Sequence, residues 1–276
     1  MSPWPSSGQR LVRRVVLLAV LWAVAFPGGA EAQGPAVVEI TGASRVEFEE
    51  ATGVWTAEGQ PVTVTRGRTV LRASRIRYDQ RARVVAAEGG AELTEPGISL
   101  AADAAELRLT DDRVRATGRV KVVSTREDPP VEVRAVEMDG VLRTRTFTAA
   151  GDVSLTRGDA TLSGRRLDYD DATQIAVATG DPAARFREAV VTAGTITLVI
   201  DEETLRAEGA ATVRRGELTG GARRVEVRSR EGTIRLVGDA QLTRGPDRVT
   251  ADEIQAALDG SRIVTRGGSR VVVTPR

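Results

Sequence analysis

The chain has 276 residues, of which 41% are hydrophobic and 28% charged, as in globular proteins, and its formal net charge is only +1. A charge so close to zero supplies no basic surface for nucleic acid, and 3% aromatic residues are too few for platforms that stack bases. The sequence contains neither cysteine nor histidine, which excludes thiol chemistry and removes the commonest general base and metal ligand. We therefore expect no nucleic-acid partner, no metal and no cofactor.

The first 32 residues have the pattern of an export signal. Three arginines lie in residues 10–14, ahead of an apolar run from Val15 to Phe26, and Ala30-Glu31-Ala32 forms an A-x-A cleavage site. The apolar run is shorter than the roughly 20 residues that a membrane-spanning helix needs. We predict a signal peptide at 1–32, cleaved before Gln33, and one domain at 33–276. An uncleaved inner-membrane anchor is the alternative.

Glycines recur at a nearly fixed interval along the rest of the chain. Successive intervals are 30, 29, 33, 29, 29, 29 and 29 residues, between Gly59, Gly89, Gly118, Gly151, Gly180, Gly209, Gly238 and Gly267. Such regularity is typical of repeat architectures. The one long interval contains an insertion at residues 125–130.

Each repeat unit contains two strand-like stretches. Around the glycine, apolar residues alternate with polar ones, as at Phe147, Ala149, Val153 and Leu155, which predicts a strand with one buried face. In the first unit the alternation slips by one residue at Gln60-Pro61, as a bulge would cause.

The second stretch starts with a small residue, followed by two polar residues and then two apolar residues that are two apart. The step of three predicts a bulge or bend at the same place in every unit. Stretches of this kind begin at Ala43, Ala73, Gly164, Ala193, Ala222 and Ala251, whereas the one at Ala135, beside the insertion, fits poorly.

Turn sequences rich in Gly, Asp and Pro close the units, as in ThrArgGlyAsp at 156–159. Counted from Val37 to Val273, the pattern predicts an all-β fold of about sixteen antiparallel strands in 29-residue, two-strand repeats. A flat open sheet of this size is implausible, so we expect bent strands that form two walls around an apolar interior. That interior is either a packed core or an apolar groove.

Three acidic pairs lie at predicted turns, and the sequence indicates no second catalytic group that would meet them. They are Asp111-Asp112, Asp170-Asp171 and Glu202-Glu203. We interpret them as solvated turn carboxylates rather than as a catalytic pair. The sequence therefore predicts no catalytic residue, and the protein is not expected to be an enzyme.

Three segments carry a family resemblance: GDVSLTRGDATLSGRRLDYDDATQI at 151–175, AEGQPVTVTRGRTVLRASRIRYDQRAR at 57–83 and GDPAARF at 180–186. With the export signal, they make residues 37–273 resemble the LptA/OstA-like family of periplasmic lipopolysaccharide-transport proteins. The resemblance implies a V-shaped β-jellyroll in the periplasm, whose apolar interior shields the acyl chains of lipid A. It also implies end-to-end homo-oligomers, joined to other bridge proteins through the terminal strands at 37–48 and 263–273.

The alternate apolar residues of the middle strands, which we call the apolar phase, are expected to point inward and therefore predict the lipid path. Its expected lining is Leu155, Leu162, Leu167, Phe186, Ile196, Leu198, Val213, Val225 and Val227. Phe186 lies one residue later than the aromatic residue usual in the family. Residues of opposite phase, such as Arg166, Asp168 and Arg224, should face away from the lipid.

Two other functions stay open at this point. One is an inner-membrane-anchored, LptC-like bridge subunit, which would retain its N-terminal segment. The other is a structural β-repeat protein of the cell envelope that binds no lipid, which fits a packed core. The identity of the mature N-terminus distinguishes the first of these.

Overall fold

A computed structural model describes residues 37–126, 128–186 and 188–274, and these residues form twenty strands and no helix. The predicted signal peptide and its cleavage site lie outside the described residues. The strands are β1 (Glu39–Thr41), β2 (Arg45–Glu49), β3 (Val54–Arg66), β4 (Thr69–Asp79), β5 (Val84–Glu95), β6 (Ile98–Arg108), β7 (Arg113–Ser124), β8 (Val131–Val141), β9 (Thr146–Arg157), β10 (Ala160–Asp170), β11 (Ile175–Thr179), β12 (Ala183–Phe186), β13 (Ala189–Thr192), β14 (Thr195–Val199), β15 (Thr204–Arg215), β16 (Leu218–Arg228), β17 (Thr233–Arg244), β18 (Asp247–Ala257), β19 (Ile263–Arg266) and β20 (Arg270–Val272).

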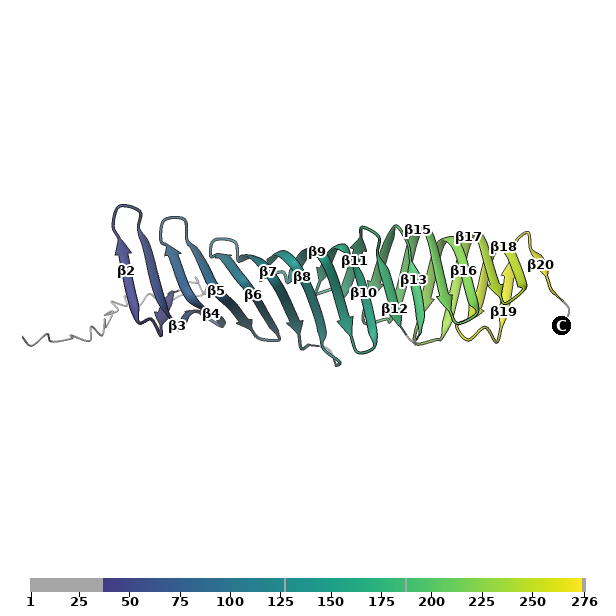
Figure 1. Cartoon of the computed structure of the whole chain (residues 1–276), viewed down its shortest axis with the longest axis horizontal. Helices are drawn as coiled ribbons and strands as arrows, with labels where there is room; N and C mark the ends of the chain where they lie inside the picture. Colours follow the sequence, from purple (N-terminus) through teal and green to yellow (C-terminus); the bar gives the residue numbers. More distant parts are fainter. Residues whose placement is uncertain (1–36, 127, 187, 275–276) are drawn as a thin grey trace, which may run out of the picture. The chain divides into compact units, whose positions relative to one another are not determined.

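The strands follow one another in chain order as one antiparallel sheet (Figure 1). Four long strands are interrupted, because β1 and β2, β11 and β12, β13 and β14, and β19 and β20 each pair with successive parts of one neighbour. Counting each of these as one strand reduces the twenty to sixteen, which confirms the predicted number. Since the two middle interruptions lie side by side, β10, β11, β14, β15, β13 and β12 form a closed ring of pairings.

A bulge in alternate strands explains the recurring glycine. On β15, Glu208 pairs with Arg224 and Ala211 with Ala222, so Gly209 and Ala210 lie opposite a single residue. Both have positive φ, 83° and 52°, a backbone conformation that glycine adopts without steric cost. The same pair of positive φ angles recurs at Gly118, Gly151, Gly180 and Gly238 and at the residue after each.

The neighbouring strands carry the predicted step of three. Ala222 and Val225 are both buried on either side of the bulge, so the shift keeps the apolar side chains on one face. The unit at Ala135, whose sequence fits the rule poorly, has the same step of three, because Ala135 and Met138 are both buried. The next inward position there is Gly140, and the ring of Phe147 fills the space that a side chain would take.

The first unit has a wider bulge. Glu58 pairs with Arg75 and Val62 with Ala73, so three residues of β3 oppose one residue of β4. Val62 and Val64 are buried, which confirms that the slip at Gln60-Pro61 returns the apolar residues to the interior.

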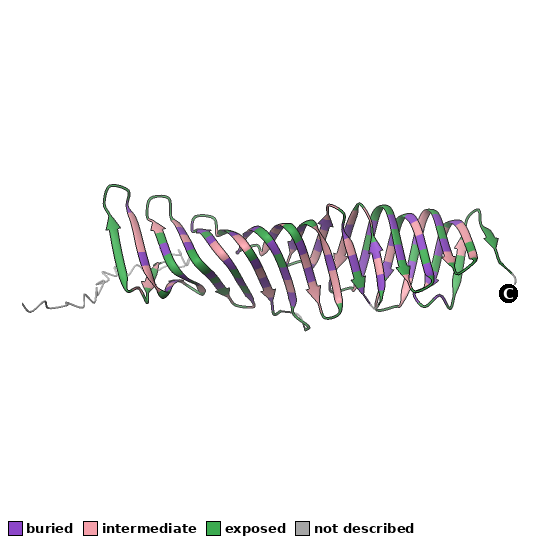
Figure 2. Cartoon of the chain, in the orientation of Figure 1, coloured by how far each residue is buried: buried purple, intermediate pink, exposed green. Residues whose placement is uncertain are grey.

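The two halves of each long strand, before and after the bulge, face each other across one apolar interior. Leu155 and Leu162, which pair with each other on one wall, lie around the same cavity as Leu198 and Leu205, which pair on the other wall. Buried and exposed residues alternate along the strands (Figure 2). The all-β, repetitive β-jellyroll that the sequence predicts is confirmed.

Candidate functional site

The nine predicted lining residues all point into this interior. Eight of them are buried, and Leu198 is partly buried against the same core. The inward side chains of the middle strands are almost entirely inaccessible to water, so they pack against one another and leave no continuous empty groove. In this state the interior is mostly a packed core.

One cavity of about 250 Å³ interrupts the packing. Four of the nine predicted residues line it, namely Leu155, Leu162, Phe186 and Leu198. Ile196, Val213, Val225 and Val227 are not among its lining residues, and Leu167 lines a much smaller void beside Tyr169. The structure therefore brings together only part of the predicted set, and it places Phe186 inward.

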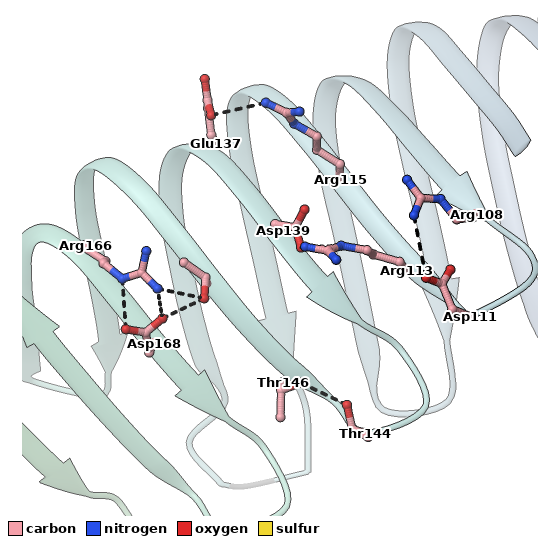
Figure 3. A network of polar contacts seen from close by, with 11 residues as sticks. Arg108, Asp111, Arg113, Arg115, Glu137, Asp139, Thr144, Thr146, Arg166 and Asp168 are labelled. Carbon is pink, nitrogen blue, oxygen red and sulfur yellow. Dashed lines mark hydrogen bonds and ion pairs between the residues drawn. The ribbon is translucent and has the colours of Figure 1, made fainter.

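The outer face is covered by ion pairs that join neighbouring strands. Arg113 pairs with Asp139 at 2.8 Å and Arg115 with Glu137 at 3.9 Å (Figure 3). On β10, Arg166 pairs with Asp168 at 2.7 Å, and both side chains lie on the side away from Leu167.

Asp168 shows how this face favours the charged form of its carboxylates. Partial burial raises the pKa of Asp168, but hydrogen bonds from Arg166 and Thr148 outweigh that effect and hold the pKa below its usual value. Arg224, the third residue predicted to face outward, is exposed and lies 2.9 Å from Glu208. The outer face is therefore charged along the whole repeat.

Apolar side chains reach the surface at both terminal strands. Among the residues that the structure describes, β1 and β2 pair only with β3, and β19 and β20 only with β18. Val46 lies opposite buried Ala57 and is 53% exposed, and Phe48 beside it is 43% exposed. At the other end, Val271 is 58% exposed. The inner face therefore continues to two open sheet edges.

The turns at the two ends of the strands form two rows, and the rows touch. The first row consists of the turns that come directly after β3, β5, β7, β9, β12, β15 and β17 in the chain. The second row consists of the turns that come directly after β2, β4, β6, β8, β10, β14, β16 and β18. The guanidinium of Arg66 in the first row lies 2.6 Å from Asp112 in the second. Arg157 likewise donates a 3.3 Å hydrogen bond to the carbonyl of Ile200. We call this line of contact the seam.

One acidic residue in the seam contradicts its predicted role. Asp170 is a turn residue as expected, since its carboxylate accepts hydrogen bonds from the N–H groups of Ala172 and Thr173. Asp171, in contrast, is a buried carboxylate rather than a solvated one. The repeat could have revealed this, because Asp171 lies one 29-residue period before Ile200, which is buried.

The described residues contain no group of three or more acidic, histidine or cysteine side chains that could hold a metal ion. Among them there is also no helix long and apolar enough to cross a membrane.

Comparison with known proteins identifies the family. The sequence profile of the LptA/(LptD N-terminal domain) LPS transport protein family matches residues 39–174 and again 132–261. One similar solved structure is LptH from Pseudomonas aeruginosa, described as the LptA-homologous periplasmic component of the lipopolysaccharide transport device. Its alignment has 11% identity and a TM-score of 0.26, and covers 53% of this chain and 96% of that one. A search of curated proteins found no match. Because the two profile matches together span most of the chain, the protein belongs to the LptA/(LptD N-terminal domain) family of LPS transport proteins.

Proposed function

We propose that this protein binds lipopolysaccharide in the periplasm, shields the acyl chains of lipid A in its apolar interior, and bridges the inner and outer membranes. The observation that carries the proposal is an inner face that is apolar from β1 to β20 and reaches solvent at both terminal strands. Each methylene group exposed to water costs about 0.8 kcal/mol, so a lipid with several acyl chains needs a continuous apolar path. The apolar interior can serve as this path, and no catalytic residue is needed for it.

Because the interior is packed, lipid must part the two walls when it enters. The lining consists mainly of Leu, Val, Ile and Ala side chains, which have no polar partner to lose, so acyl chains can replace contacts between the walls with similar contacts. The outer ion pairs join strands within the sheet, and they can stay in place while the walls separate.

We further propose that the terminal strands join this chain to others. Within the described part of the chain, both edges have no further strand paired to them, and a strand of a second copy or of another bridge protein can add there. The signal peptide at 1–32 stays a prediction. Export with cleavage before Gln33 would give the free periplasmic form, and retention would give the anchored alternative.

Photo-crosslinking tests lipid binding directly. A crosslinking amino acid at Leu162, Leu198 or Val225 should capture lipopolysaccharide in cells, because these positions face the interior. The same amino acid at Arg166 on β10 or Arg224 on β16, on the outer face of the strands that carry Leu162 and Val225, serves as the matched control and should capture none. Capture at both faces, or at neither in a folded protein, would mean that the interior is a closed structural core.

A further inference from the structure

The wall that carries Leu155 and Leu162 has an outer face whose charges change along the chain. Its outward side chains form two lines across the strands, because alternate residues of each strand point outward. On β7 and β8 these lines carry Lys121, Glu132 and Arg134, and Glu132 lies 2.9 Å from Lys121 and 2.6 Å from Arg134. The charges of this part of the wall are therefore paired.

From β12 onward the same two lines contain arginine but, in the described strands, neither aspartate nor glutamate. The line nearer to the first row of turns consists, in order of strand pairing, of Arg185, Val190, Arg214, Thr219, Thr243, Arg248 and Val272. The second line consists of Ala183, Thr192, Thr212, Gly221, Gln241, Thr250 and Arg270. We call these two lines the arginine face.

The four arginines of this face are exposed, and none of them makes an ion pair with another described residue. Strands lie about 4.8 Å apart, so Arg185 and Arg214 are roughly 10 Å from each other and the face is roughly 29 Å long. Arg248 and Arg270 are diagonal neighbours on adjacent strands, about 7–8 Å apart. The net charge of +1 therefore conceals a local excess of positive charge, which favours an anionic partner.

An open depression of about 570 Å³ lies in the middle of the arginine face. A Cβ at Gly221 would have no neighbouring atom closer than 3.9 Å, so the missing side chain leaves this space free. Arg223 and Asp239 at the rim lie 3.2 Å apart and balance each other's charge. The lining on the face itself is formed by Thr212, Thr219, Gly221, Gln241, Thr243 and Arg248.

The side chains of the face match the groups of an acidic sugar chain. A guanidinium group donates two parallel hydrogen bonds to a carboxylate or phosphate, and threonine and glutamine both donate to and accept from hydroxyl groups. The described residues of the face include no aromatic side chain and, beyond alanine, only Val190 and Val272 as apolar ones. Protein partners are usually held by aromatic and apolar anchors, and membrane surfaces by apolar side chains that enter the lipid, so both fit less well.

We propose that the arginine face binds an anionic polysaccharide, which lies along the two lines with its acidic groups on the arginines and its hydroxyl groups on the threonines and Gln241. This goes beyond the proposed function, because the face is on the outside of the wall and lipid is proposed to lie inside. Loss of polysaccharide binding would therefore leave lipid binding intact.

Fluorescence polarisation with a labelled alginate oligosaccharide, a chain of uronic acids, tests the face in the purified full chain. Arg214→Gln combined with Arg248→Gln should weaken binding about tenfold or more, because two charge-assisted contacts are lost. Arg113→Gln combined with Arg235→Gln is the matched control, since it removes the same charge from the other wall, where both arginines are in ion pairs. The control should bind alginate as the unmodified protein does. Equal weakening in both double variants would show a general charge effect and overturn the proposal.

Gly221→Val tests the depression without a change of charge. Its backbone is not in the left-handed region, so valine is tolerated, and the side chain should fill the depression and weaken alginate binding several-fold. Circular dichroism checks that each variant is folded.

Two further probes identify the class of partner. Polyglutamate with the same number of carboxylates should bind more weakly than alginate, because it has no hydroxyl groups for the threonines. Equal binding of polyglutamate would favour an acidic protein, and binding to phosphatidylglycerol vesicles but not to alginate would favour a membrane surface. Either result, or a folded protein that binds no alginate, would overturn the proposal.

Discussion

Gly140 on β8 lies directly opposite Phe147 on β9, and the aromatic ring occupies the space above the glycine. A methyl group at position 140 would meet this ring and the carbonyl oxygen of Thr146, 2.9 Å away. The missing side chain therefore lets a large residue fill the interior at this position.

Gly140→Ala should consequently lower the free energy of unfolding by about 2 kcal/mol, since Phe147 cannot move without disturbing the packed core. Urea denaturation followed by circular dichroism measures the change. Gly221→Ala is the control, because its φ is not in the left-handed region and the nearest atom to an added methyl group is 3.9 Å away. A loss of equal size in both variants would show that the ring does not determine the effect.

Arg145→Ala should lower the free energy of unfolding by about 2 kcal/mol or more, because it leaves the buried Asp171 carboxylate with only one ion-pair partner, Arg126. Arg143→Ala, at an exposed position two residues earlier, should change it by less than about 0.5 kcal/mol. Equal unfolding midpoints for the two variants would mean that Asp171 does not depend on Arg145.

The repeat period and the alternation of apolar residues were sufficient to predict the all-β fold, the number of long strands and the inward phase. These features are local, because the glycine of a bulge, as at Gly209, and the step of three from Ala222 to Val225 can each be recognised in the sequence of one repeat unit. Even the inward position of Phe186 follows from this phase.

The seam was not predictable in the same way. Ser124 and Asp171 are 47 residues apart, and their contact depends on how the two rows of turns meet after the strands bend. In a single turn, the pair Asp170-Asp171 is typical of solvated carboxylates. Only comparison with the equivalent positions of neighbouring repeats, Leu142 and Ile200, shows that Asp171 takes a position that is apolar there. The alternation of apolar and polar residues likewise could not distinguish a packed core from an open groove, because the same apolar residues point inward in both.

Stability should not change between about pH 8 and pH 6, because the chain has no histidine and no other ordinary side-chain pKa falls there. Hydrogen bonds from Arg235 lower the pKa of Glu253, and those from Arg119 lower the pKa of Asp103. A carboxylate with a lowered folded pKa stabilises the protein above its unfolded pKa, and the contribution is lost as the pH falls through the folded value.

The free energy of unfolding, measured in urea at a series of pH values, should therefore decrease only below about pH 4. Arg235→Gln should make this decrease shallower, since the pKa of Glu253 then returns toward its ordinary value. A decrease between pH 8 and pH 6 would contradict the assignment of the pH dependence to these carboxylates.

Val272→Pro tests the terminal edge as an assembly surface. Val272 lies on β20, which pairs with β18 on one side and leaves its other edge open, and its side chain is 44% exposed. Proline removes a backbone N–H and is poorly compatible with continued strand pairing. If chains join end to end through this edge, the variant should stay monomeric at concentrations where the unmodified protein forms longer species. Sedimentation velocity measures the distribution.

Val272→Thr is the matched control, because threonine keeps the backbone N–H and the strand preference while it changes the same side chain. This variant should assemble as the unmodified protein does. Stability should remain close to that of the unmodified protein in both variants, since β20 is exposed along its whole length and few contacts depend on it. Assembly that persists in the folded proline variant would place the joining surface elsewhere, and monomers of the unmodified protein at all concentrations would remove the self-association altogether.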